Sequence, residues 1–325
     1  MQYFDLHCDS LYEAVTKEKD LVENDMHVSF QKGSRYSPWV QCMAVWIPDN
    51  VRGQAAFDFV EQCAGRLDGM LKGNPYEVIK AGCKKDLEKV RRLGLRSVIL
   101  TVEGGAAIGG KLENVKKLAG LGVKMMTLTW NGRNELGGGA FVKENPGITP
   151  FGRAVISENE RYGIINDVSH ASDALFYDAA QYAKKPLAAS HSNARAVCGH
   201  PRNLTDEQFL IIKNCGGIVG LNFSRSFLRG DEKATTDDIL RHAEHFLSLG
   251  GEDTVCIGSD FDGTDMPDGM DDITGIGPLY ESFLRQNYKE NQLQKIFFGN
   301  ACNFFESFDT VSYTHLRAHE TDSYL

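Results

Sequence analysis

The feature that most constrains the fold of this chain is an alternation of short apolar runs with helical stretches. Such alternation, repeated eight times, implies parallel strands joined by crossover helices, and eight such units can close into a barrel. We therefore predict a (β/α)8, TIM-like barrel of the α/β class. The apolar, β-branched runs cover residues 3–7, 40–47, 97–103, 123–129, 164–170, 187–191, 218–222 and 255–260.

Helical patterns fill the intervals between these runs. They cover residues 54–71, 84–93, 173–184, 206–214 and 237–249. An open doubly wound sheet is the alternative, but no G-x-G-x-x-G motif follows the first run, and polar residues end strands all along the chain. We predict one catalytic barrel domain over residues 1–310. Residues 311–325 lack periodicity, and we interpret them as a non-native or disordered tail outside the fold.

Charge and hydropathy exclude several classes of partner. The 325-residue chain has a formal net charge of -9, whereas a protein that binds a phosphate backbone is normally basic, so we expect no nucleic acid partner. No apolar run approaches the ~20 residues of a membrane-spanning helix, so we expect no membrane partner. The N-terminus has neither a basic nor an apolar leader region, which favours a cytoplasmic protein. The eight cysteines include no C-x-x-C pair, which favours free buried thiols.

Five of the apolar runs end on residues that can bind a metal or move a proton. The carboxyl ends of the strands are where an α/β barrel places its chemistry. A histidine and an acid at positions i and i+2 of a strand point to the same face, and this ligand pair suits zinc or a similar divalent ion. The residues at these ends are His7 with Asp9, Glu103, His170, His191 and Asp260.

The glutamate among these residues is the hardest to explain by packing. Glu103 follows an apolar strand and precedes Gly104 and Gly105, and a buried carboxylate is costly unless it is paired or bound to a metal. Its two oxygens can bridge two metals, while His170 and His191 end successive units and come side by side. Two metals ~3.5–4 Å apart can activate a bridging water and polarise a carbonyl, so we predict that the barrel is of the metal-dependent hydrolase type.

Asp260 has no histidine partner of its own in the sequence. A carboxylate at the barrel mouth could take a proton from water and pass it to a leaving amine. Asp262, in the same Asp-Phe-Asp-Gly segment, is better interpreted as a turn residue, because Asp and Gly favour turns. Cys8 lies between two predicted ligands and points to the opposite strand face, which favours core packing over metal binding.

Several motifs together resemble the renal (membrane) dipeptidase family, peptidase family M19 of the amidohydrolase superfamily. The resemblance runs from about residue 3 to about residue 308. The motifs occur in family order: Asp5-Leu6-His7-Cys8-Asp9, Glu103-Gly104-Gly105, Ser169-His170, Ser190-His191-Ser192, Pro201-Arg202-Asn203-Leu204 and Gly258-Ser259-Asp260-Phe261-Asp262-Gly263.

The resemblance implies a zinc-dependent dipeptidase with two Zn²⁺ ions per chain. A water bridged between the ions would hydrolyse the peptide bond of a small dipeptide substrate. Asp260 would shuttle the proton, and Arg202 would grip the dipeptide carboxylate, a task that suits guanidinium geometry. The resemblance also implies a homodimer. The implied ligands are His7 and Asp9 for one ion, His170 and His191 for the other, and Glu103 as the bridge.

The sequence departs from this family after the run at 123–129. Mammalian-type members carry a substrate-facing histidine where this chain has Trp130. Tryptophan offers a single N–H donor and no charge, so Asn131 or Asn134 would supply the missing donor. Trp130, Asn131 and Asn134 are therefore predicted substrate-binding residues.

Two other functions remain open from the sequence. A related amidohydrolase acting on N-acyl amino acids or lactams would use the same metals. A non-catalytic metal-binding barrel is the second alternative, although a complete ligand set and a proton shuttle argue against it. His242 and His245 are interpreted as part of a solvated or packed helix face, with metal ligation as the alternative. His200 either lines the substrate pocket or lies on a surface loop.

Overall fold

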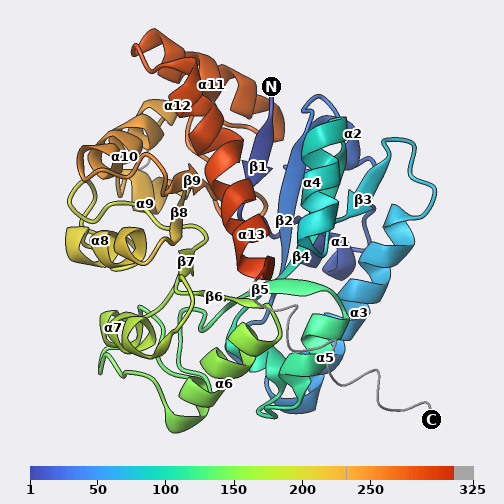
Figure 1. The fold of residues 1–325 in the computed structure, drawn as a ribbon, viewed down its shortest axis with the longest axis vertical. Coiled ribbons are helices and arrows are strands. Elements are labelled where there is room, and N and C mark those ends of the chain that lie inside the picture. Colours follow the sequence, from blue (N-terminus) through green and yellow to red (C-terminus); the bar gives the residue numbers. More distant parts are fainter. Residues whose placement is uncertain (232, 311–325) are drawn as a thin grey trace.

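The computed structural model describes residues 1–231 and 233–310 of the chain. Within these residues, nine parallel strands form one sheet, with the order β2-β1-β9-β8-β7-β6-β5-β4-β3 and an additional pairing of β2 with β4 (Figure 1). The strands are β1 Tyr3–Asp5, β2 Trp39–Trp46, β3 Val78–Lys80, β4 Arg96–Glu103, β5 Val123–Thr127, β6 Ile165–Asp167, β7 Ala188–Ala189, β8 Ile218–Leu221 and β9 Val255–Ile257.

The pairing of β2 with β4 closes the barrel. These two strands pair along their whole length, from Trp39 against Arg96 to Trp46 against Glu103. The short strand β3 pairs only with the first half of β4, and β5 pairs with the second half. Eight strands therefore form a closed parallel barrel and β3 lies outside it, which confirms the predicted (β/α)8 fold. The three residues of β3 were not predicted.

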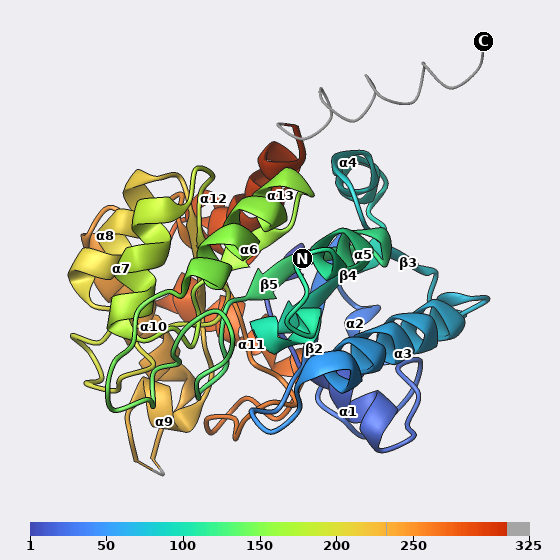
Figure 2. The same ribbon diagram turned by 90° about the horizontal axis from the view of Figure 1, so that it is seen from below.

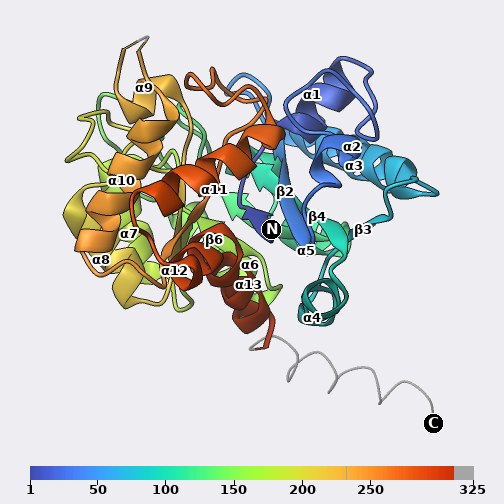
Figure 3. The ribbon, with the colours of Figure 1, turned by 90° about the horizontal axis from the view of Figure 1, so that it is seen from above.

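Helices surround the barrel on its outer face (Figures 2 and 3). Two predicted helices have the predicted bounds, at 84–93 and 206–214. The helices are α1 Ser10–Thr16, α2 Phe30–Gly33, α3 Gly53–Leu71, α4 Lys84–Leu93, η1 Gly105–Ile108, α5 Asn114–Gly120, α6 Pro150–Arg161, α7 Asp173–Tyr182, α8 Asp206–Asn214, α9 Arg225–Leu228, α10 Thr236–Ser248, η2 Ile273–Gly275, α11 Ile276–Arg285, α12 Glu290–Gln294, η3 Lys295–Gly299 and α13 Asn300–Thr310.

The C-terminal helix closes the end of the barrel where the strands begin. Apolar residues near the starts of the strands, such as Phe4, Val40 and Ile218, form one buried cluster with side chains of η3 and α13. The Phe4 ring lies 5.4 Å from that of Phe305 and 6.2 Å from that of Phe298, between centroids. In Figure 1, α13 crosses the barrel on this side. The opposite end, where the strands finish, is left for the site.

Most of the predicted strands extend too far toward the site. β6 ends at Asp167, three residues before His170, and β9 ends at Ile257, three residues before Asp260. His170 and Asp260 have φ angles of 66° and 64°, in the left-handed region that a strand cannot include. The predicted ligands beyond β1, β6 and β7 therefore lie in turns that follow the strands. Glu103 is the exception, as the last residue of β4.

Two predictions about the ends and the environment of the chain can be placed here. The predicted tail, residues 311–325, lies outside the described residues, and the assignment of residues 1–310 to one domain stays a prediction. Across the described part of the chain, we find no helix that combines the length and the apolar character needed to cross a bilayer.

Candidate metal centre and substrate pocket

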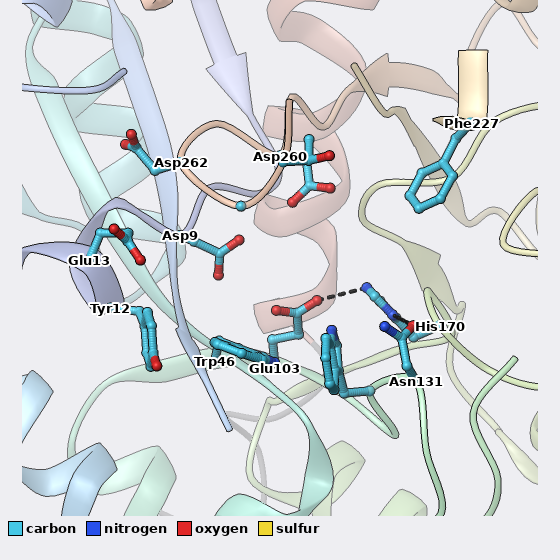
Figure 4. Close-up of a pocket in the computed structure, with 13 residues that line it drawn as sticks. Asp9, Tyr12, Glu13, Trp46, Glu103, Asn131, His170, Phe227, Asp260 and Asp262 are labelled. Carbon is cyan, nitrogen blue, oxygen red and sulfur yellow. Dashed lines mark hydrogen bonds and ion pairs between the residues drawn. The ribbon is translucent and has the colours of Figure 1, made fainter. Parts of the chain in front are cut away.

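The five predicted metal ligands meet at the carboxyl ends of the strands, and all five are buried. One oxygen of the bridging candidate, Glu103 Oε1, lies 2.8 Å from His170 Nε2 and 3.5 Å from His191 Nε2. The other oxygen, Oε2, lies 3.8 Å from His7 Nε2, which is 3.5 Å from Asp9 Oδ2. Figure 4 shows Glu103 between Asp9 on one side and His170 on the other.

These residues form two groups of ligand atoms that share the glutamate. His7, Asp9 and Glu103 make one group, and Glu103, His170 and His191 make the other, with the ligand atoms of each group within 4.8 Å of one another. Because each carboxylate oxygen faces a different group, Glu103 lies between the two groups of candidate ligand atoms. A third group of ligand atoms joins His7 and His191 to Asp260.

The hydrogen bonds of the two neighbouring imidazoles assign a tautomer to each ring. His170 Nδ1 lies 2.8 Å from Asn131 Oδ1, and His191 Nδ1 lies 2.7 Å from Ser190 Oγ. Both partners serve as acceptors, so each ring carries its proton on Nδ1 and presents an Nε2 lone pair. Burial lowers the pKa of both histidines well below the usual value, which keeps the rings neutral.

Three lone-pair-bearing groups therefore converge on the first metal site. The two Nε2 atoms are only 2.8 Å apart, and the Glu103 carboxylate faces both of them. Such an arrangement is unfavourable without a cation between the atoms, and imidazole nitrogen with carboxylate oxygen is the donor set of zinc sites. The residues present thus fit a divalent metal ion.

The second metal site also contains atoms without partners. His7 Nε2 and Asp9 Oδ1 are buried and make no hydrogen bond with any other described residue. Burial disfavours the charged form of His7, but the nearby carboxylates, led by Glu103, outweigh it and raise the pKa to about 10. This excess of buried negative charge is what a bound cation would neutralise.

Asp260 reaches the same centre from the turn after β9. Its Oδ1 lies 3.8 Å from His7 Nε2, and its Oδ2 accepts a hydrogen bond of 2.9 Å from Asn222 Nδ2. Burial is the main cause that raises the pKa of Asp260, to about 6. A carboxyl group with this pKa can both accept and donate a proton near neutral pH.

A pocket of about 210 Å³ opens above the candidate metal centre. One wall is aromatic: the Trp46 ring lies 4.8 Å from Trp130 and 4.9 Å from Tyr12, between centroids. Phe227 lies on the opposite side, near His170 (Figure 4). The pocket therefore has the candidate metal centre at its base and aromatic side chains in its walls. The space between these walls is of the size of an amino-acid side chain.

The three residues predicted to replace the family histidine are placed differently from one another. Trp130 and Asn131 line the pocket. The Asn131 side-chain oxygen is engaged by His170, so this residue orients a metal ligand. Asn134 does not line the pocket. Its side chain bonds to the backbone of Leu128, Leu136 and Gly137 and shapes its own loop.

Arg202 is buried beside the pocket, and two of its guanidinium nitrogens lack a hydrogen-bond partner. Its Nε and Nη2 atoms make no hydrogen bond to any other described residue, and its guanidinium carbon lies 5.2 Å from the centroid of the Phe227 ring. Burial lowers the pKa of Arg202 to about 10, although the nearby carboxylates of Asp260 and Glu103 act to raise it. Arg202 and His170 line a small second cavity. Phe227 lines the main pocket and contacts Arg202, so its ring lies between the two cavities.

The structure also places the residues for which two interpretations were open. Cys8 packs in the apolar core. Asp262 accepts bonds from Ser10 Oγ and the His27 N–H, so it holds a turn. His242 is buried in a helix, where it bonds to the backbone of Leu228 and Ala194.

Two further histidines have structural partners. His245 pairs with Asp206, which agrees with the packed helix face predicted for this residue. The His200 ring lies between Phe227, at 4.6 Å, and Phe141, at 5.9 Å between centroids, and its Nδ1 accepts the Arg202 N–H. His200 thus packs beside the pocket without lining it.

Four residues that support the site were missed in the sequence. Asn222 bonds to Asp260, Ser190 bonds to His191, and Asp5 and Asp167 hold the turns that carry His7 and His170. The only signal is that Asp5 and Asp167 precede a predicted histidine ligand by two and three residues.

Comparisons with known proteins agree with this architecture. A family model described as Membrane dipeptidase (Peptidase family M19) matches residues 1–318. An uncharacterized protein in the pqqA 5' region of Klebsiella pneumoniae is 34% identical over 225 residues, which cover 66% of this chain and 83% of that protein. Dipeptidase 3 of Rattus norvegicus is 30% identical over 220 residues, 66% of this chain but only 45% of the rat protein.

Two solved structures are similar over nearly the whole chain. A metallo peptidase from Rhodobacter sphaeroides, liganded with a phosphinate mimic of the dipeptide L-Ala-D-Ala, has a TM-score of 0.87 at 26% identity and covers 94% of this chain and 99% of its own. The dipeptidase AC, a metallo peptidase of family M19, has a TM-score of 0.88 at 27% identity, with 95% and 99% covered. The chain therefore belongs to the membrane dipeptidase family of metallopeptidases, Peptidase family M19.

Proposed function

We propose that this protein is a dipeptidase that uses two Zn²⁺ ions to hydrolyse the peptide bond of dipeptides. The observation that supports two ions is the division of Glu103 between two ligand groups, one oxygen to each. When bound, such ions lower the pKa of water and polarise a carbonyl group. His7 and Asp9 would hold one ion, and His170 and His191 the other.

The residues of the chain supply proton transfer and substrate orientation. Asp260, with a pKa of about 6 set mainly by burial, takes a proton from the attacking water and returns it to the leaving amine. The hydrogen bond from Asn222 fixes the direction of its carboxylate. The aromatic wall of Tyr12, Trp46 and Trp130 excludes water from one side of the pocket.

The substrate class rests on Arg202. A buried guanidinium with two nitrogen atoms that lack a partner is costly unless an anion binds it, and a carboxylate matches its planar geometry. Arg202 lies next to His170, so a carboxylate held there belongs to a substrate whose scissile bond is close by. Only a short substrate with a free C-terminus fits this description, and the Rhodobacter sphaeroides relative binds a dipeptide mimic.

Replacement of Arg202 by methionine tests the substrate class. We expect Arg202→Met to raise the KM for L-Ala-D-Ala by about 10- to 100-fold, because hydrogen bonds to a charged group contribute about 1.5–3 kcal/mol. The measurement is steady-state hydrolysis of L-Ala-D-Ala and of its C-terminal amide by both proteins. The C-terminal amide should be a poor substrate for both proteins, and its KM should differ little between the wild type and Arg202→Met. An unchanged KM for the free dipeptide would exclude the carboxylate role.

The alternative amidohydrolase activity shares the same centre. N-acyl amino acids also carry a free carboxylate, so Arg202 does not separate them from dipeptides. Hydrolysis of N-acetyl-alanine at a rate equal to that of Ala-Ala would favour this alternative. Metal binding without turnover of either compound would favour the non-catalytic barrel. A homodimer and a cytoplasmic location complete the proposal, and gel filtration with light scattering tests the first.

A further inference from the structure

Two buried aspartates at opposite sides of the barrel make nearly the same set of hydrogen bonds. Asp167, the last residue of β6, accepts the N–H groups of Ser169 and Ser190, both at 2.9 Å. It also accepts the hydroxyls of Ser190, at 2.6 Å, and Thr127, at 2.7 Å. These four donors occupy the lone pairs of the carboxylate, which is fully buried.

Asp5, the last residue of β1, repeats the pattern against the neighbouring strand β9. It accepts the N–H groups of His7, at 3.3 Å, and Ser259, at 2.9 Å, and the hydroxyls of Ser259, at 2.6 Å, and Tyr3, at 2.9 Å. Each aspartate therefore ties a turn that carries a candidate metal ligand to a serine that follows the adjacent strand.

The two serines differ in their remaining contacts: Ser190 Oγ also bonds Ser169 Oγ, at 3.4 Å, and Ser259 Oγ also accepts the Phe261 N–H, at 3.2 Å, but the difference that matters for a metal ligand is a contact with an imidazole. Ser190 Oγ also lies 2.7 Å from the Nδ1 atom of His191, whereas Ser259 Oγ contacts the backbone oxygen of His7 and no imidazole ring. Because the single hydroxyl proton of Ser190 is donated to Asp167, its oxygen is left to accept the Nδ1–H of His191. The Nε2 atom of His191 then faces the metal site without a proton.

We propose that Asp167 acts through Ser190 as a positioning pair that sets the tautomer and the ring orientation of His191 for metal binding. This inference deepens the proposed function and rests on it. Partners of this kind, outside the ligands themselves, raise the metal affinity of a site. Without the serine oxygen, Nδ1 has no acceptor there and the ring loses the contact that fixes it.

An asparagine at position 167 would leave Ser190 in place but would release its hydroxyl proton from the contact with residue 167. One of the two groups of the asparagine amide donates hydrogen bonds, so asparagine cannot accept from all four donors. A Ser190 hydroxyl released from Asp167 can turn its proton toward His191 Nδ1. The ring would then carry its proton on Nε2, which would block the lone pair that faces the metal site.

The experiment measures Zn²⁺ affinity by competition with a chromophoric chelator, using Ser190→Ala and, as the matched control, Ser259→Ala. Both variants lose one hydroxyl bonded to a buried aspartate, but only the first loses a contact with an imidazole. We expect Ser190→Ala to weaken one of the two Zn²⁺ sites by about 10- to 100-fold, the range typical of partners outside the ligand set. Ser259→Ala loosens the turn that carries His7 but removes no contact with an imidazole, so it should weaken Zn²⁺ binding by a clearly smaller factor than Ser190→Ala.

Nitrogen-15 NMR of the histidine rings in the metal-free protein gives a second readout that needs neither metal nor substrate. The proposal predicts a His191 ring protonated on Nδ1 in the wild type and redistributed toward Nε2 in Asp167→Asn. If Asp167→Asn does not fold, the wild-type spectrum and the two serine variants decide. An Nε2-protonated ring in the wild type, or equal Zn²⁺ affinity in the two serine variants, overturns the proposal. A loss of dipeptide hydrolysis alone would concern the proposed function and not this pair.

Discussion

Asp260→Asn is expected to lower kcat for dipeptide hydrolysis by about 10²- to 10⁴-fold, the usual contribution of a general acid–base group. The substitution preserves the shape of the side chain and a partner for Asn222, but the amide cannot carry a proton between water and amine. The Zn²⁺ content should stay close to that of the wild type, because His7 and His191 retain their other ligand partners in both metal groups. The measurement is kcat on L-Ala-D-Ala together with metal analysis.

A control on the same loop separates this effect from a general loss of structure. Asp265 is exposed, so Asp265→Asn removes the same charge a few residues away and should leave kcat within about 2-fold. If Asp260→Asn retains more than about a tenth of the wild-type kcat with full metal content, another group moves the proton.

Glu103→Gln is expected to have the other large effect, because it acts on both metal sites together. The glutamine keeps the shape but has one oxygen, so only one of the two ligand groups retains a donor from this residue. We expect Zn²⁺ affinity to fall by more than about 100-fold at one site, beyond the range for partners outside the ligand set. Competition with a chelator measures the affinity, and hydrolysis should fall with it.

The control for this substitution is Glu113→Gln, which changes an exposed glutamate at the start of α5. It should bind two equivalents of Zn²⁺ as the wild type does. Two sites of unchanged affinity in Glu103→Gln would mean that Glu103 does not bridge them.

The metal ligands could be predicted from the sequence because their chemical type is unusual for the positions they occupy. Glu103 and His191 follow apolar runs, where burial of a charge or an imidazole needs a partner. In a parallel barrel the carboxyl ends of all strands lie at the same end, so no further sequence signal is needed to bring these residues together. The (β/α)8 fold itself followed from the alternation of apolar and helical segments, a pattern that covers most of the chain.

The exact ends of the strands could not be predicted from these patterns. His170 and Asp260 adopt positive φ angles, which His and Asp tolerate better than most residues but still adopt rarely, and their backbones are held by tertiary hydrogen bonds to Ala140 and His7. β3 is only three residues long, too short for a periodic pattern, and is recognisable only by its pairing with β4.

The supporting residues are invisible in the sequence for a related reason. Ser190 is an ordinary polar residue, and Asn131 was predicted to bind substrate; their contacts with the imidazoles of His191 and His170, within 3 Å, appear only in the folded chain. Asn134 could not be separated from Asn131 by residue type alone. Their different roles depend on which one the loop after β5 turns toward the metal centre.

Titration of the metal-free protein with Zn²⁺, with hydrolysis of L-Ala-D-Ala followed at each step, tests the central claim most directly. The division of Glu103 between two ligand groups predicts that activity is absent in excess chelator and rises until two equivalents of Zn²⁺ per chain are bound. Full hydrolysis by protein stripped of metal, or an activity that is complete after one equivalent, would contradict the two-metal account.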